Sequence, residues 1–264
     1  MNTLPSRTFS QKFHLRSIFW FLLILLIIAF SSAITSTNLA EFFNHDSLAQ
    51  FAVIWGRMFH PDWDYWPYVF GPLLDTIRMA LVGTLLGTVI AVPFALLSAR
   101  NIISISWIRG VTRLFSNLIR TLPDLLLAAV FTAILGFGPL AGVVTLLFFT
   151  FGQMAKLTFE SIETIDQGPL EALEAAGANK IQVIFFAVIP QITNNFLSNF
   201  LYTFEVNVRA STVIGYVGAG GIGQLLQVTI NQFRYDQTAV IIFVILLVVI
   251  FIEFTNTYIR EKLA

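Results

Sequence analysis

The sequence contains 264 residues, of which 56% are apolar and only 11% are charged, and its 15 basic residues balance its 15 acidic ones. Soluble domains carry about 25% charged residues, so this composition excludes a soluble globule and indicates an integral membrane protein. The even charge balance gives no indication of a nucleic-acid partner. The absence of cysteine excludes disulfides, thiolate metal sites and a cysteine nucleophile, and the three histidines lack the spacing of zinc ligands.

Apolar segments that are candidates to cross a membrane follow one another along the chain. A spanning helix takes about 20 mostly apolar residues. In chain order the six candidates are 18–34, 73–99, 123–135, 140–159, 190–217 and 239–258. Glycine and proline at 136–139 predict a tight turn between the third and the fourth.

We therefore expect an all-α membrane protein with about six transmembrane helices. The expected partition is a cytoplasmic N-terminus over 1–17, the first helix over 18–34, an extracytoplasmic loop over 35–72 and a five-helix core over 73–264, with a cytoplasmic loop at 166–190. The first helix also has features of a signal peptide, because Lys12 and Arg16 precede it and small residues follow it. Its apolar run is long for such a peptide, which favours a retained anchor.

The basic residues predict the orientation, because Lys and Arg are enriched in cytoplasmic loops. With the N-terminus inside, eleven of the fifteen fall on the cytoplasmic side, namely Arg7, Lys12, Arg16, Arg100, Arg109, Arg113, Arg120, Lys156, Lys180, Arg260 and Lys262. Both termini are therefore expected in the cytoplasm, and Lys156 is assigned to the loop after the fourth span.

The segment 101–120 has an amphipathic pattern. Its apolar residues recur at i, i+3 or i+4 and i+7, while Arg109, Arg113 and Arg120 take other faces. This pattern predicts a helix lying at the cytoplasmic interface. A plain N-terminal extension of the third span fits the same residues, so the sequence leaves both interpretations open.

The segment 168–190 predicts a short helix, a sharp turn and a second helix. Pro169 suits the first position of a helix, and Gly177 is placed to take the left-handed conformation after it. The second helix is expected to start after Asn179 and to enter the membrane at Pro190. A cytoplasmic loop with this much structure usually docks onto a partner.

This segment resembles the cytoplasmic loop of permease subunits of ATP-binding-cassette importers, which has the form E-A-A, three residues, G, nine residues, I-x-L-P. The matching residues are Glu171, Ala172, Gly177 and Pro190, with Glu174 on the same short helix. The departures are Leu173, Ala187 and Ile189. The resemblance implies a type I importer permease architecture, in which this loop sits in a groove of a separate ATPase subunit and transmits its closure.

Three further stretches, 76–87, 120–124 and 207–223, look like those of phosphonate-type importer permeases. This resemblance implies uptake of phosphonates, phosphite or related phosphorus oxyanions and esters, delivered by an extracytoplasmic binding protein to a homodimer in the cytoplasmic membrane. The chain has no G-x-x-x-x-G-K-[ST] motif, so ATP and Mg²⁺ are expected on the partner ATPase, with no cofactor here. A permease for methionine or glycine betaine is the first alternative, and an ion-driven carrier is a more distant one. An intramembrane enzyme would need clustered His, Asp or Ser nucleophile motifs in the spans, which the sequence lacks.

Three short motifs have plainer structural explanations. The glycines of 218–223 match a dinucleotide fingerprint as text, but no strand is expected before them, so we interpret them as a tight backbone turn. Gly83 and Gly87 form a GxxxG pair that favours internal helix packing over a dimer seam. Glu171 and Glu174 lack a neighbouring nucleophile or metal motif, so docking is favoured over catalysis.

Charged residues inside the second and fifth spans form the last candidate site. Asp75, Arg78, Glu205 and Arg209 are expected at similar depth in the outer third of the membrane. Glu205 and Arg209 have the i, i+4 order of a favourable ion pair. One hypothesis is structural pairing, within the fifth span or across to the second. The other is that Arg209, with Asn207 and Arg78, lines the outer mouth of a pathway for an anionic solute.

Overall fold

The computed structural model describes residues 15–34 and 44–263 of the chain, which divides into two units at Arg57 and Met58. The first unit contains α2 (Leu15–Ile34) and all but the last residue of α4 (His45–Met58). Helix α2 is 20 residues long and its apolar part is Ile18–Ser31. The segment 35–72, expected as an extracytoplasmic loop, thus contains α4 and the start of the next long helix, α5.

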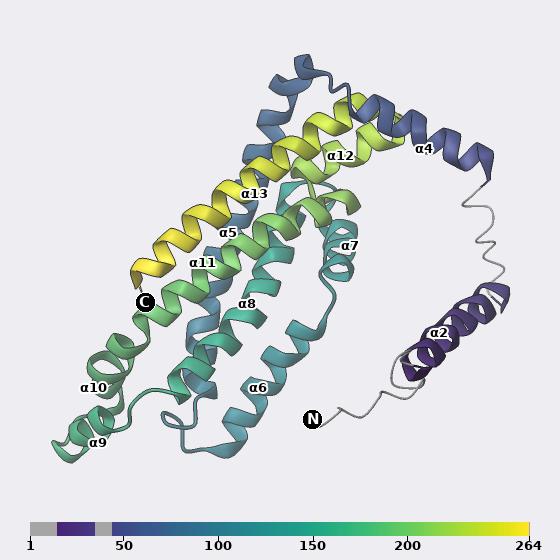
Figure 1. Ribbon diagram of the computed structural model, residues 1–264. Helices are drawn as coiled ribbons and strands as arrows, with labels where there is room; N and C mark the ends of the chain where they lie inside the picture. The colour runs from purple at the N-terminus through teal and green to yellow at the C-terminus, as the bar shows by residue number, and fades with distance from the viewer. Residues whose placement is uncertain (1–14, 35–43, 264) are drawn as a thin grey trace, which may run out of the picture. The chain divides into compact units, whose positions relative to one another are not determined.

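The second unit is a bundle of long helices, shown in Figure 1. Three of the four segments that are long and apolar enough to cross a membrane are α5 (Trp66–Ser98, preceded by η1, Trp63–Tyr65), α8 (Pro139–Glu163) and α13 (Tyr235–Leu263). The fourth is a continuous helical segment over Lys180–Ala219, made of α10 (Lys180–Val183), the π-turn η2 (Ile184–Val188), α11 (Ile189–Ile214) and the π-turn η3 (Gly215–Ala219). Every element in the described residues is helical, which confirms the all-α class.

The third predicted span is a broken one. Helix α6 (Ser106–Thr121) and helix α7 (Asp124–Leu135) are bent by 86° at the break between them. Leu122 and Pro123 there have extended backbone, with ψ of 130° and 135°, and proline supplies no amide hydrogen to continue the helix. The described residues therefore contain four helical segments long and apolar enough to cross a membrane, or five if the bent pair counts as one span. A straight extension of α7 is excluded, because α6 is a separate helix.

Helices α5 and α8 form the most extensive helix contact of the core. A Cβ atom added to Gly83 would lie 2.6 Å from Leu146 Cβ, and one added to Gly87 would lie 2.6 Å from the backbone oxygen of Leu147. The two glycines thus allow the helix backbones to approach closely. The prediction of internal packing by this GxxxG pair is confirmed.

Lys156 lies within α8 and not in the loop after it, because α8 continues to Glu163. Its amino group pairs with Glu160 at 3.5 Å, and 29% of its side chain is exposed. Pro190 lies in the first turn of α11. It follows the π-turn η2 inside a continuous helical segment, where the wider turn accommodates a residue without an amide hydrogen.

The glycine-rich segment after α11 forms a turn that leads into α12 (Gly221–Asn231), a short helix before α13 that the sequence patterns did not predict. Gly218, Gly220 and Gly221 have φ of 93°, 84° and 69°. The amide of Ile222 donates to Thr76 Oγ1 of α5 at 2.8 Å. The preceding element is a helix and not a strand, so the dinucleotide interpretation is excluded and the tight turn is confirmed.

Candidate functional site

The candidate coupling loop is a helix-turn-helix whose geometry is set by its own sequence. Helix α9 (Gly168–Ala175) has proline in its first turn, and two residues after its end stands Gly177, whose φ is 84°. The amide of Gly177 donates to Glu174 O and that of Ala178 donates to Leu173 O, both at 3.0 Å. This is the Schellman arrangement that closes a helix with a left-handed glycine, so the predicted conformation of Gly177 is confirmed.

The second helix of the loop begins at a capping box. The amide of Gln182 donates to Asn179 Oδ1 at 2.9 Å, and the amide of Asn179 donates to Gln182 Oε1 at 2.8 Å. Two amide groups that a helix start leaves open are thereby satisfied. The predicted start after Asn179 is confirmed, and the two caps hold α9 and α10 in a defined relative orientation.

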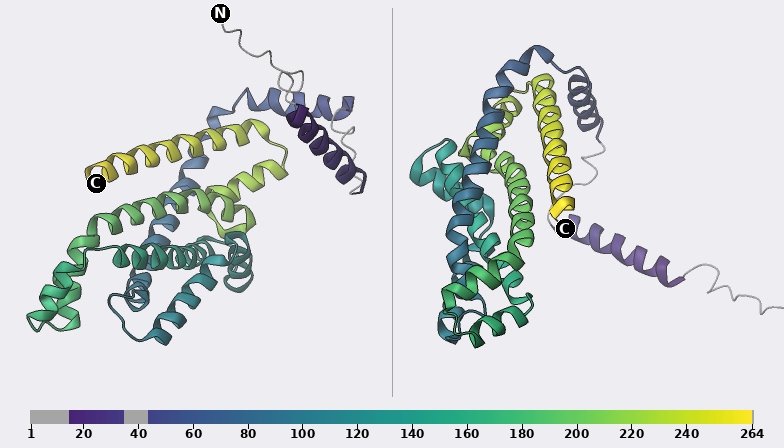
Figure 2. Two further views of the ribbon diagram at one scale, coloured as in Figure 1. Left: turned by 60° about the horizontal axis from the view of Figure 1, so that its bottom comes forward. Right: turned by 90° about the vertical axis from the view of Figure 1, so that its left-hand side faces the viewer.

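One face of these two helices packs on the core and the other is exposed. Leu170 of α9 and Val183 of α10 are buried against Ile102, in the connection after α5, and Ile162, near the end of α8. Lys180 Nζ donates to the carbonyl of Ile102 at 3.1 Å. The exposed face carries the candidate residues Glu171, Ala172, Glu174 and Gly177. Figures 1 and 2 place α9 and α10 at the end of the core opposite to α12, where a partner has access to them.

Glu163, at the end of α8, is a positioning residue that the sequence analysis left unassigned. Its carboxylate accepts from the amide of Arg100 at 2.8 Å and pairs with Arg113 of α6. Arg113 also donates to the carbonyl of Ser98 and stacks on Phe159 at 4.7 Å. A carboxylate at a helix C-terminus interacts unfavourably with the helix dipole. The position of Glu163 at a helix end is therefore the sequence signal that this carboxylate needs a cation beside it. The cluster fastens α5 and α6 to the element that leads into the coupling loop.

Glu163→Ala is expected to destabilise the chain by about 1–3 kcal/mol, because it removes the acceptor of the Arg100 amide and one of the two acceptors of the partly buried Arg113 guanidinium. The measurement is unfolding in mixed micelles by titration with denaturing detergent. Arg100→Ala is the matched control. It removes an exposed pair at 3.6 Å but keeps the backbone bond to Glu163, so its cost should be about 0–1 kcal/mol. Equal losses in the two variants would contradict this role.

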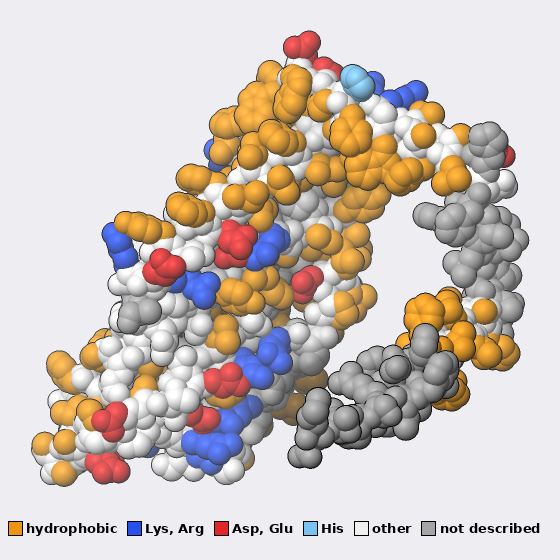
Figure 3. Space-filling model, in the orientation of Figure 1, with side chains coloured by type: hydrophobic (Ala, Val, Ile, Leu, Met, Phe, Trp, Pro, Cys, Tyr) orange, Lys and Arg blue, Asp and Glu red, His pale blue; other side chains and the backbone are white. Residues whose placement is uncertain are grey.

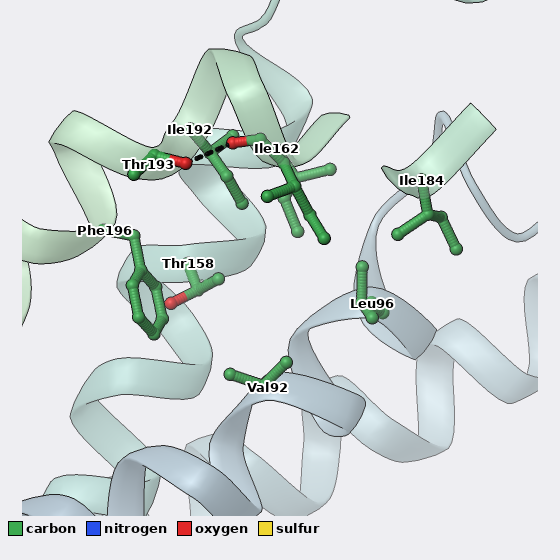
Figure 4. Close-up of a pocket in the computed structure, with 9 residues that line it drawn as sticks. Val92, Leu96, Thr158, Ile162, Ile184, Ile192, Thr193 and Phe196 are labelled. Atoms are coloured by element: carbon green, nitrogen blue, oxygen red, sulfur yellow. Dashed lines mark hydrogen bonds between the residues drawn. The ribbon is translucent and has the colours of Figure 1, made fainter. Parts of the chain in front are cut away.

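A cavity of about 220 Å³ lies beside the start of α11, between α5 and α8 (Figure 4). Its lining is almost wholly apolar, with residues such as Val92, Ile162 and Phe196. The hydroxyl of Thr193 donates to the carbonyl of Ile189 at 2.6 Å, and that of Thr158 has no hydrogen-bond partner in the described chain. An anion would lose its hydration there without replacement, so this cavity is excluded as a site for a charged solute.

The four charged candidates form two separate pairs, one on each helix. Asp75 and Arg78 of α5 pair at 3.6 Å and are well exposed. Arg209 pairs with Glu205 on α11, and the arginine is 49% exposed while the glutamate is 8% exposed. The hypothesis of pairing within the fifth span is confirmed, and pairing across to the second span is not observed.

Asn207 occupies a different place from the one expected. It is fully buried, and its amide nitrogen donates to Thr84 Oγ1 of α5 at 2.7 Å and to Thr150 Oγ1 of α8 at 2.6 Å. It therefore joins three helices and faces no pathway in this structure. The same bonds place Asn207 level with Thr84, so Arg209 lies two residues outward of that level and Arg78 lies six, which corrects the expected similar depth.

Comparison with known proteins gives the family. Residues 83–264 match the family model described as "Binding-protein-dependent transport system inner membrane component". The chain is 37% identical over 216 residues to the phosphite transport system permease protein PtxC of Stutzerimonas stutzeri, covering 82% of this chain and 78% of that protein. It is 36% identical to the phosphate-import permease protein PhnE of Mycolicibacterium smegmatis, over 80% of this chain and 40% of that protein.

A solved structure gives the fold. The chain resembles a chain of the methionine ABC transporter MetNI in an inward-facing conformation, with a TM-score of 0.66 and 22% identity, over 74% of this chain and 96% of that one. At this identity the likeness concerns the fold alone. The protein is an all-helical transport permease with the fold of ABC importer permeases, and it belongs to the family of binding-protein-dependent transport system inner membrane components.

Proposed function

We propose that this chain is the membrane-spanning permease of an ATP-driven importer for phosphite, phosphonates or related phosphorus oxyanions. The observation that carries the proposal is the coupling loop, a capped helix-turn-helix whose inner face is buried on the core and whose outer face is exposed. The substrate class is inferred from the likeness to the phosphite permease, which covers most of both chains.

In this proposal the exposed face of α9 docks in a groove of a separate ATPase subunit, which binds ATP and Mg²⁺. Closure of the ATPase pair pushes Glu171, Ala172 and Glu174, and the buried contacts of Leu170 and Val183 carry the movement to α5 and α8. Two copies of the chain form the pathway, and an extracytoplasmic binding protein delivers the solute. Asp75, Arg78, Glu205 and Arg209 are the proposed charged residues of the pathway.

The test is uptake into proteoliposomes that contain this chain, its ATPase and its binding protein. We expect ATP-dependent uptake of phosphite, competed by phosphonates. Competition by methionine or glycine betaine and not by phosphorus compounds would favour the alternative solutes. Uptake that follows an ion gradient without ATP would contradict the importer class.

The proposed orientation has both termini in the cytoplasm. Because the native chain has no cysteine, Glu174→Cys and Gln232→Cys each introduce a single exposed thiol at opposite ends of the core. Cysteine at 232, between α12 and α13, should react with an impermeant reagent in intact cells. In cells that express the chain without its ATPase, the thiol of Glu174→Cys should react only after permeabilisation, and the reverse pattern would overturn the orientation.

A further inference from the structure

The exposed face of α11 carries a polar stripe that packing within the chain does not explain. Its members are Asn195, Ser198, Tyr202 and Arg209, whose spacings of three, four and seven residues place them on one side of the helix. Asn207 and Thr203, on another side, are buried against α5 and α8. The stripe extends over about 21 Å, from the coupling end of the span to its middle.

The uncharged members of the stripe have no protein partner. Asn195, Ser198 and Tyr202 make no side-chain hydrogen bond within residues 15–34 and 44–263 and are at least partly exposed. Gln153 of α8, in the same part of the span, also lacks a side-chain bond to the described residues. Amide and hydroxyl groups in a membrane are stable only against water or other polar groups.

The charge on this side of the core is arranged asymmetrically. Figure 3 shows acidic and basic side chains gathered over α6, α8 and α11 on the visible face. The carboxylate of Glu205 lies beneath the surface while the guanidinium of Arg209 is half exposed. Lys156 and Glu160 of α8 neutralise each other as a pair. A solute moving along the stripe therefore meets the exposed guanidinium of the Glu205–Arg209 pair and not its buried carboxylate.

We infer that Asn195, Ser198, Tyr202 and Arg209 form the wall of a water-filled pathway for a small oxyanion. Asn195, Ser198 and Tyr202 supply donors that replace water around oxyanion oxygens, and Arg209 offers the planar fork that suits them. Asp124 of α7 lines a cavity of about 300 Å³ with Ala210 and Val213. A carboxylate there disfavours an anion, so the preference for anions is confined to Arg209 and positions inward of it. The inference rests on the proposed function, since it assigns residues to the same transport pathway.

The test of a water-filled pathway uses Asn195→Cys, Ser198→Cys and Tyr202→Cys. Each substitution is made singly in the full chain, assembled with its partners. Each thiol should react with two water-soluble methanethiosulfonate reagents, one anionic and one cationic. Leu85→Cys and Val89→Cys are the matched controls, because these side chains of α5 are 46% and 69% exposed but lie on an apolar surface. The control thiols should be protected by lipid from both reagents. Unreactive thiols on the stripe would show that lipid or a second copy covers it, and would overturn the inference.

Charge preference is the second measurement. For Ser198→Cys and Tyr202→Cys, the ratio of the anionic to the cationic labelling rate should be about tenfold higher than the same ratio for the exposed thiol of Gln232→Cys. The double exchange Glu205→Gln with Arg209→Gln should abolish this gain, and Arg209→Lys should retain it. A ratio unchanged by the double exchange would refute the role of Arg209. If labelling is as expected but the assembled importer takes up no phosphite, the proposed solute is wrong, while the assignment of these residues to a water-filled pathway still holds.

Discussion

Gly177→Val is expected to abolish ATP-driven uptake while the chain still inserts in the membrane. The residue has φ of 84°, and no atom lies within 4 Å of an added Cβ, so the effect comes from the backbone and not from a clash. A left-handed conformation costs an ordinary residue about 1–2 kcal/mol, and a β-branched one more. Relief of that strain opens the turn and reorients α9 relative to α10. The measurements are ATPase stimulation and the amount of chain in the membrane.

Gly177→Asn is the matched control for this prediction, because asparagine tolerates the left-handed conformation at a helix end. It should retain most of the uptake. If valine and asparagine were equally active, the turn would have no part in coupling. If both variants failed to reach the membrane, the loop would serve insertion and not energy transfer.

Gly87→Val is expected to reduce the amount of folded protein strongly. The added Cβ would lie 2.6 Å from Leu147 O and 2.6 Å from Thr150 Cβ, and backbone atoms cannot move aside as a flexible side chain does. Overpacking of this kind costs about 3 kcal/mol, here at the most extensive helix contact of the core. The variant should lose folded protein after extraction and unfold at a lower fraction of denaturing detergent.

Gly110→Val controls for helix propensity in this test. Gly110 lies in α6, is exposed, and has no heavy atom within 4 Å of an added Cβ, so its replacement should leave the yield of folded protein unchanged. A comparable loss at both positions would mean that close approach of α5 and α8 is not what Gly87 provides.

Local signals were sufficient to predict the coupling loop. The Pro169 start, the left-handed Gly177 and the helix after Asn179 each depend on residues within a few positions of one another. The same holds for Gly83 and Gly87, whose spacing alone indicates a close helix contact. Features of this kind need no knowledge of which segments meet in space.

Features that depend on distant partners were not predictable in this way. Asn207 is buried because Thr84 and Thr150, which are 123 and 57 residues away, offer it oxygens. The bend at Pro123 has a local cause, but its size of 86° reflects the packing of α6 and α7 on α8. The role of Glu163 depends on Arg113, 50 residues earlier in the chain. The assignment of Lys156 to a loop was wrong, because the expected fourth segment, 140–159, already contains this residue and α8 continues to Glu163.

The π-turn η2 connects α10 to α11, so the number of residues in it determines the direction in which the coupling helices point. Each residue of an α-helix turns the chain by about 100°, and a π-turn corresponds to one residue inserted into such a helix. Deleting one residue between Ile184 and Val188 would rotate α10 about the axis of α11 and carry Lys180 away from Ile102. Homologues that work with the same ATPase should therefore vary in side chains here but not in length.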